Sequence, residues 1–151
     1  MNAPIDPIDQ RIIDALAHDG RMSIAALAAE AGLTKTPTQT RLRRLREEGY
    51  ILGFRAILDP SKLGRDHVAF VEVKLDKTGE NALAAFNAAV RKIPEIETCH
   101  LIAGAFDYLL KVRTRDIRAY RTVLGERISS LPHVGSTSTH VAMQAVKDEI
   151  L

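Results

Sequence analysis

The stretch from Thr34 to Arg46 concentrates hydroxyl, amide and guanidinium side chains and contains no carboxylate. Such groups can read DNA bases, because arginine bridges O6 and N7 of guanine, glutamine pairs with adenine, and threonine offers a hydroxyl or a methyl group. Arginine and lysine also bind phosphate oxygens, which positions a protein on DNA without specifying sequence. We predict groove contacts from Thr36, Gln39, Thr40 and Arg43, and phosphate contacts from Lys35, Arg41, Arg44, Arg46 and Arg55.

The elements expected around these side chains form a helix-turn-helix, whose second helix enters the DNA major groove. Ser23 caps a short Ala-rich helix, Gly32 supplies a tight turn, and the second helix runs from Thr34 to about Glu48. Leu42 and Leu45 define its buried side. An ordinary amphipathic helix fits this periodicity equally well. The combination of Ala-rich helix, Gly turn and carboxylate-free outer stretch favours DNA binding.

Charge is unevenly distributed along the chain. The formal net charge is only +2, but the segment from Leu33 to Arg55 contains six basic and two acidic side chains. Residues 1–32 carry two basic and five acidic side chains. Positive charge is therefore concentrated where phosphate contacts are predicted, although a merely solvated face would have the same composition.

The flanking segments complete an N-terminal domain. A first helix is expected to begin at Asp6, which can cap it, and to end at Asp19-Gly20. Residues 50–58 are expected to form one or two short strands, as a small wing or a linking strand. Asp59-Pro60 breaks this pattern. We expect domains over residues 1–60 and 61–151.

The second domain alternates strands and helices. Strands are predicted over 68–75, 96–103, 108–113 and 136–146, helices over 80–93 and 116–131, and a tight turn over 104–107. In the second helix, Ile117, Tyr120 and Ile128 are predicted to point inward. The order βαββαβ is that of a ferredoxin-like antiparallel sheet with both helices on one face. The expected fold class is α+β.

The other sheet face is expected to pair two copies of the chain. It is predicted to present the apolar residues Val68, Phe70, Leu109, Val141 and Met143. A few base contacts on one helix discriminate weakly, whereas two helices on a twofold dimer read a palindrome. A homodimer is therefore predicted.

The sequence lacks the usual patterns of enzymes, metal sites and membrane proteins. Its five histidines show no metal-ligand spacing, and Cys99, in an apolar pattern, has no obvious activating partner. There is no Gly-rich phosphate loop and no apolar run of about 18 residues. The acidic N-terminus does not resemble a secretory signal. We expect a cytoplasmic protein without a cofactor, metal ion or membrane partner.

Several short patterns occur in one order along nearly the whole chain. They are Ile5-Asp6 with Asp9, Asp19-Gly20-Arg21, Leu33 to Gly49, Gly53-Phe54, Asp59-Pro60, Gly104-Ala105-Phe106-Asp107-Tyr108-Leu109-Leu110-Lys111 and Ala119-Tyr120-Arg121. Their joint spacing resembles the leucine-responsive and asparagine-responsive (Lrp/AsnC) regulator family. The resemblance implies an N-terminal winged helix-turn-helix, a C-terminal ligand-sensing domain called RAM, dimers that assemble further into octamers, and transcription control by amino acids.

The resemblance also implies an effector pocket between subunits, against the 104–107 turn. In such a pocket Asp107 would accept hydrogen bonds from the ammonium group of an amino acid. Exposed amides of the turn would bind the carboxylate of that amino acid. Asp107 is alternatively a turn residue that satisfies its own backbone. His140 stands where many relatives carry tyrosine, which leaves the effector open. The implied pocket residues are Leu101, Gly104, Ala105, Phe106, Asp107 and Tyr108, with Thr139, His140 and Val141 of a neighbour.

Two rival functions remain open from the sequence. One is an architectural protein that compacts double-stranded DNA without an effector. The other is a small enzyme, because ferredoxin-like sheets also carry acyl and phosphoryl transfer. The missing catalytic patterns count against the enzyme.

Overall fold

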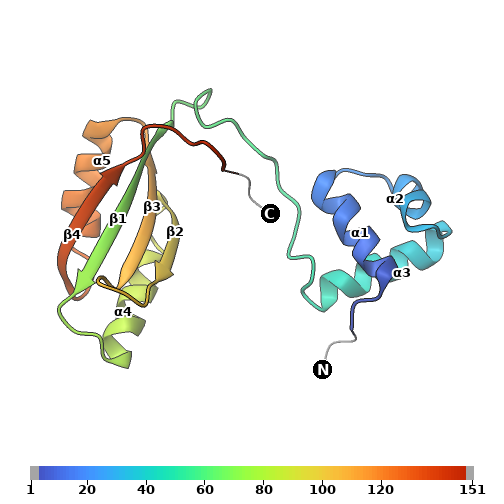
Figure 1. Ribbon diagram of the computed structural model, residues 1–151, viewed down its shortest axis with the longest axis horizontal. Coiled ribbons are helices and arrows are strands. Elements are labelled where there is room, and N and C mark those ends of the chain that lie inside the picture. The colour runs from blue at the N-terminus through green and yellow to red at the C-terminus, as the bar shows by residue number, and fades with distance from the viewer. Residues whose placement is uncertain (1–3, 149–151) are drawn as a thin grey trace. The chain divides into compact units, whose positions relative to one another are not determined.

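The computed structural model describes residues 4–148, which divide into two compact units (Figure 1). The first extends to Ile57 and the second spans Leu58–Asp148. The first unit contains three helices and the second a four-stranded sheet with helices. This agrees with the predicted α+β class and with the predicted order of a helix-turn-helix followed by a ferredoxin-like domain.

The first unit is built from α1 (Pro7–His18), α2 (Ile24–Ala31) and α3 (Lys35–Glu47). Local residues define where each helix begins and ends. Ser23 accepts a hydrogen bond from the Ala26 amide at 3.2 Å, as its predicted capping role requires. Gly32 ends α2 with φ 71°, a conformation that glycine adopts without a Cβ clash. Their core consists of Ile12, Leu27, Ala31 and Leu45.

The predicted strands in residues 50–58 are wrong for this structure: the described chain is irregular from Leu52 to Asp66. A strand exists only where a neighbouring backbone completes its hydrogen-bond ladder, and no described segment pairs with this one. The Ile51 amide instead donates to the Leu45 carbonyl at 3.0 Å, which ties the chain to the end of α3. Phe54 packs over Gly20, whose added Cβ would meet the phenyl ring at 3.3 Å.

The second unit has the predicted βαββαβ order. Its sheet runs β2-β3-β1-β4 with every pair antiparallel. The observed final strand starts two residues earlier and stops five residues earlier than predicted. The elements are β1 (His67–Leu75), α4 (Glu80–Val90), β2 (Ile96–Leu101), β3 (Tyr108–Thr114), α5 (Ile117–Val123), a π-helical turn η1 (Leu124–Ile128) and β4 (Val134–Val141).

Strand alternation divides this sheet into a covered and an open face. In β1 and β3 alternate side chains are buried under α4 and α5, including Val71 and Leu110 (Figure 1). Phe86 of α4 stacks on Tyr108 with ring centroids 4.3 Å apart. Ile117, predicted to point inward, is 48% exposed because it stands at the first turn of α5, and the prediction for it was wrong.

The open face, as we define it, is the sheet surface away from these helices. It carries the predicted apolar residues Val68, Phe70 and Leu109, which alternate with the buried positions. Val141 was wrongly predicted there, because it pairs with Ala69, whose side chain is buried on the other face. Met143 lies beyond the end of β4 and is fully exposed.

Charged side chains and one histidine surround the apolar centre of the open face. His140 Nε2 lies 3.3 Å from Glu72 Oε1, and Lys111 Nζ lies 2.7 Å from Asp148 Oδ2. Arg113 pairs with Glu97 of β2. We call Glu72, His140, Lys111 and Arg113 the charged fringe of this face.

Candidate DNA interface and effector site

The outer face of α3 gathers most of the predicted DNA contacts. Thr38 and Leu45 point into the core and are fully buried, so the opposite side of the helix faces solvent. The outer face is defined by six exposed residues: Lys35, Thr36, Gln39, Thr40, Arg43 and Arg46. All six carry groups that hydrogen-bond base edges or phosphates.

The polar groups of this face differ in whether they already form hydrogen bonds or ion pairs within the protein. The Thr40 hydroxyl donates to the Thr36 carbonyl at 3.2 Å, which leaves its oxygen and its methyl group for a ligand. The Arg43 side chain is 69% exposed, and its only described ion pair is a long one of 3.9 Å to Glu47. The Arg43 guanidinium is therefore largely available to a ligand.

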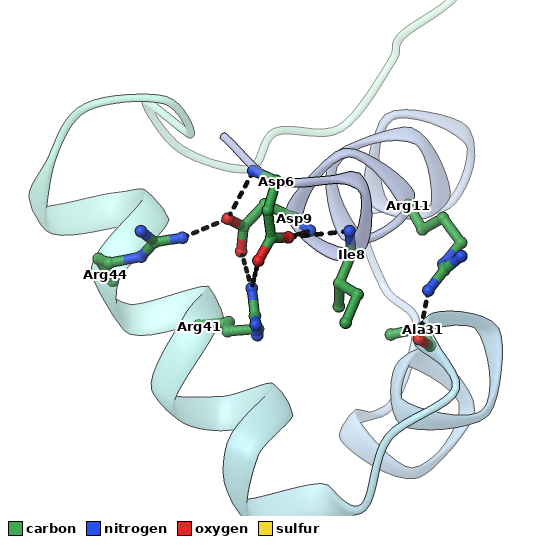
Figure 2. A network of polar contacts seen from close by, with 7 residues as sticks. All are labelled: Asp6, Ile8, Asp9, Arg11, Ala31, Arg41 and Arg44. Carbon is green, nitrogen blue, oxygen red and sulfur yellow. Dashed lines mark hydrogen bonds and ion pairs between the residues drawn. The ribbon is translucent and has the colours of Figure 1, made fainter. Parts of the chain in front are cut away.

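Arg41 and Arg44 are in a different environment. Arg41 Nη1 donates to Asp6 Oδ2 at 2.6 Å and to Asp9 Oδ1 at 2.9 Å, and Arg44 Nη2 donates to Asp9 Oδ2 (Figure 2). We call these four residues the aspartate–arginine cluster. The phosphate contacts predicted from these two arginines therefore belong to guanidiniums that already pair with carboxylates of α1 and its cap.

The carboxylates of the cluster are fixed by the start of α1. Asp6 accepts from the Ile8 and Asp9 amides at 2.9 and 2.8 Å, while Asp9 Oδ2 accepts from the Asp6 amide at 3.2 Å. This reciprocal pair is a capping box. Sequence analysis identified Asp6 as a cap but missed the arginine contacts, since partners more than 30 positions apart carry no local signal.

Hydrogen bonding keeps both carboxylates charged. The Asp9 amide and the Arg41 guanidinium lower the pKa of Asp6 to about 2. Burial alone would raise the pKa of Asp9, but hydrogen bonds from Arg44 and Arg41 outweigh it and lower that pKa. The same contacts raise the pKa of both arginines. The cluster is thus ionised at neutral pH.

Arg55 lies apart from α3 in the chain. It is exposed within the irregular segment that follows the helix-turn-helix. Its predicted phosphate contact stays a prediction.

The hairpin between β2 and β3 contains the turn over residues 104–107, where the effector pocket was expected, and we call it the effector turn. Gly104 and Ala105 are exposed and Phe106 is half-buried. Asp107 Oδ2 accepts from the Leu75 amide at 2.7 Å, and the Asp107 amide donates to the Val73 carbonyl at 2.9 Å. Asp107 therefore ties the turn to the end of β1, whereas the alternative interpretation from the sequence expected its side chain to bond its own turn backbone. Its Oδ1 has no described partner.

Two other predicted pocket residues flank this turn. Leu101, at the end of β2, is 60% exposed and accessible to a ligand. Tyr108 is buried, and its hydroxyl donates to Asn87 Oδ1 at 2.8 Å. The Tyr108 side chain thus supports the core beneath the turn.

The remaining predicted pocket residues lie elsewhere on the sheet. Thr139, His140 and Val141 stand opposite Val71, Phe70 and Ala69 in β1, whereas the effector turn bonds to Val73 and Leu75. At about 3.3 Å per residue, the nearest of these β1 positions, Val71 and Val73, are roughly 7 Å apart along the strand, and the farthest, Ala69 and Leu75, are roughly 20 Å apart. The Thr139 hydroxyl is also bonded to Tyr120 of α5. No described hydrogen bond or ion pair joins the two groups within one chain.

Other chemistry finds little support in residues 4–148. No group of three or more His, Cys, Asp or Glu side chains in this range is arranged to hold a metal ion. Cys99 is half-buried, and burial raises the pKa of its thiol, which disfavours the thiolate. Within the same range no helix has the length and apolar character needed to span a bilayer.

Sequence profiles of two domain families match the chain. A profile described as the Lrp/AsnC ligand binding domain matches residues 68–150, and one described as winged helix-turn-helix DNA-binding matches residues 5–51. The first profile covers the sheet unit with the effector turn, and the second covers α1, α2 and α3.

Whole-chain comparisons give relatives over nearly the full length. The chain is 66% identical to a proline dehydrogenase transcriptional activator of Rhizobium radiobacter, over 95% of this chain and 92% of that protein. It is 45% identical to the leucine-responsive regulatory protein of Salmonella typhimurium, over 95% and 87%. A transcriptional regulator of Neisseria meningitidis, solved with L-methionine, matches at TM-score 0.89 and 27% identity over 96% and 94%.

Proposed function

The chain belongs to the Lrp/AsnC family of transcriptional regulators, and from this premise we propose that it activates genes of proline breakdown in response to an amino acid. The observation that carries the proposal is the exposed outer face of α3, on a domain whose relatives regulate transcription. The gene class comes from the name of the 66% identical relative. Proline is the first candidate effector.

We assign DNA recognition to the outer face of α3 together with Arg55. Thr36, Gln39, Thr40 and Arg43 would contact base edges, and Lys35, Arg46 and Arg55 would contact phosphates. A chain with this role acts on chromosomal DNA in the cytoplasm, and we assign no catalytic reaction to it.

The proposed effector site is shared between copies of the chain. The effector turn contributes Asp107 Oδ1 for the ammonium group and exposed amides near Gly104 for the carboxylate. Residues 139–141 pair with β1 on the side opposite to β3 and make no described bond to the turn of their own chain, which supports their contribution from a neighbour. Proline fits the polar part of such a site, since its ring nitrogen carries two N–H donors when charged.

We propose that the chain pairs through the open face, and that pairs assemble into octamers. The apolar centre around Phe70 supports this assignment, because exposed apolar patches on a sheet mark self-association. Pairing also supplies the second recognition helix that a palindromic site requires.

A ligand screen tests the effector assignment. Thermal unfolding is followed with each proteinogenic amino acid at saturating concentration, with leucine and methionine as the critical comparisons to proline. We expect proline to raise the unfolding midpoint, because a ligand bound only by the folded state stabilises it. A shift for another amino acid would redirect the assignment. No shift for any of them would favour an architectural DNA-compacting role.

A footprint tests the DNA assignment independently. The protein is titrated on the DNA upstream of a proline dehydrogenase gene and on an unrelated promoter of equal length. We expect protection of two half-sites separated by one or two helical turns on the first DNA alone. Equal, featureless protection of both would contradict sequence-specific regulation.

A further inference from the structure

Cationic side chains lie along both sides of the exposed surface of α3. At about 100° per residue, Lys35 and Arg46 lie along one flank and Arg41 and Arg44 along the other. We call these the free row and the tied row, because only the second is held by the aspartate–arginine cluster (Figure 2). The major groove has a phosphate backbone on each wall. A helix lying in it therefore presents one row to each strand.

The tied row retains donors for a phosphate. An arginine carries five N–H donors. In the contacts described here, Arg41 uses only Nη1 and Arg44 only Nη2. The two side chains are 28% and 31% exposed. Each guanidinium can thus bind a carboxylate on one edge and a phosphate oxygen on another.

Asp9 is the residue that holds both guanidiniums. Its side chain is 1% exposed, its Oδ1 accepts from Arg41, and its Oδ2 accepts from Arg44. Of the two arginines, Asp6 pairs only with Arg41, and the Asp6 side chain is 42% exposed. Asp9 is itself held by the capping box at the first turn of α1. It is therefore a rigid anchor for two otherwise flexible side chains.

We propose that Asp9 is a positioning residue for DNA binding, which holds Arg41 and Arg44 where their remaining donors meet the phosphates of one DNA strand. This rests on the DNA-binding role proposed for α3. A free arginine loses rotamer freedom when DNA orders it, whereas an arginine already ordered by Asp9 loses less. Asp9 thus favours binding although its own charge repels phosphate.

These two effects of Asp9 have opposite signs, which makes Asp9→Asn the decisive variant. The substitution keeps the shape of the side chain and removes one negative charge beside the DNA. Electrostatics alone predicts tighter binding. Loss of positioning predicts weaker binding, by about tenfold for two arginines that must now be ordered on DNA.

The experiment measures affinity against salt concentration with a mixed-sequence duplex of about three helical turns. Wild type, Asp9→Asn, Arg41→Ala and Arg44→Ala are compared. Lys35→Ala measures the contribution of the free row. Arg11→Ala is the control, since Arg11 lies on α1 and donates to the Ala31 carbonyl at the end of α2. Each phosphate contact contributes about 0.9 to the slope of log affinity against log salt.

We expect Lys35→Ala, Arg41→Ala and Arg44→Ala each to lower the slope by about 0.9, and Arg11→Ala to leave it unchanged. Asp9→Asn should weaken binding in the wild-type background but not with Arg41→Gln and Arg44→Gln already present. If the ion pairs of Asp9 with Arg41 and Arg44 only stabilised the fold, the effect of Asp9→Asn on DNA affinity would not depend on these arginines. The slope of log affinity against log salt would then also stay unchanged.

Folding is checked by circular dichroism at the temperature of the titration. If an alanine variant is unfolded there, the glutamine variant at the same position replaces it. The proposal is overturned if folded Asp9→Asn binds as tightly as wild type or tighter. It is also overturned if Arg41 and Arg44 variants keep the wild-type slope while Lys35→Ala lowers it. Wild type without salt-dependent binding would instead overturn the proposed DNA-binding function itself.

Discussion

Arg43 is the exposed arginine nearest the middle of the outer face, and its guanidinium is nearly free. A bidentate arginine–guanine pair contributes about 1–3 kcal/mol of discrimination. We expect Arg43→Ala to weaken binding to a preferred site by this amount and to relax base preference at one position. Selection of binding sites from a random DNA pool measures both. Arg115→Ala, an exposed arginine of the sheet unit, should leave the selected sequence unchanged.

Asp107 has one observed bond and one proposed role, and conservative variants can separate the two. Its Oδ2 accepts from the Leu75 amide, and its Oδ1 is proposed to bind the ammonium group of the effector. Asp107→Asn retains an acceptor for Leu75 but loses the charge, whereas Asp107→Ala loses both. We expect neither variant to bind the effector in calorimetry. Only Asp107→Ala should also lose stability, by about 1–3 kcal/mol for the unpaired amide. Full effector binding by Asp107→Asn would contradict the pocket assignment.

At the residue scale, the sequence predicted the environment of a side chain correctly where that environment depends only on the side chain's position in its own helix. Exposure of Arg43 follows from helical periodicity with Leu45 buried, and both are observed. The pairing of Arg44 with Asp9 depends on how α1 packs against α3, which no local pattern encodes. The dual bonding of Asp107 likewise depends on β1 lying beside the turn.

At the element scale, the start of α1 makes a prediction about acid. The pKa of Asp6 is lowered from 3.8 to about 2, and that of Asp9 is lowered too. A folded state that binds fewer protons gains stability with rising pH. Stability from these carboxylates is therefore complete above about pH 4 and is lost as the pH falls toward 2.

Asp6→Asn tests this dependence without removing the cap, because asparagine caps helices as well as aspartate does. Between pH 4 and pH 2, thermal midpoints of the variant should fall less than those of wild type. Parallel midpoint curves for the two proteins would show that Asp6 does not link protonation to folding.

The edge of the sheet makes another prediction at this scale. A Cβ at Gly135 would lie 3.3 Å from both the Asp76 nitrogen and the Lys74 carbonyl oxygen, so backbone must move to admit it. We expect Gly135→Ala to destabilise the protein by about 1–3 kcal/mol, measured by urea unfolding. Gly125→Ala is the matched control, since nothing lies within 4 Å of its added Cβ.

Elements with their own boundary residues were predicted well. The cap at Ser23, the turn at Gly32 and the βαββαβ order of the second unit all follow from local signals, whereas the π-helical turn η1 at the end of the second helix was not predicted. The strand prediction for residues 50–58 failed because an apolar run forms a strand only when a second strand is present to pair with it. The early end of β4 has the same cause: its ladder with β1 stops at Val141.

At the scale of the whole molecule, the open face predicts the oligomeric state. Phe70 stands at its centre and is 38% exposed. A glutamate there would bury a charge in the proposed interface, so we expect Phe70→Glu to sediment as a monomer. Leu63→Glu alters an exposed apolar residue outside the sheet and should sediment as wild type does. An unchanged oligomer for Phe70→Glu would place the interface elsewhere.

The charged fringe has a consequence for which chains can share an interface. In a twofold pair, each charge of one copy meets a residue drawn from the same set on the other. A related chain of the same fold, with its charges in another order, would bring like signs together or leave a charge buried without a partner. In the proposed pair, the fringe around Phe70, with Glu72 beside His140 and Lys111 beside Arg113, would therefore favour a second copy of the same chain as the partner. Two regulators of this family in one cell would then remain separate populations, each with its own effector and its own genes.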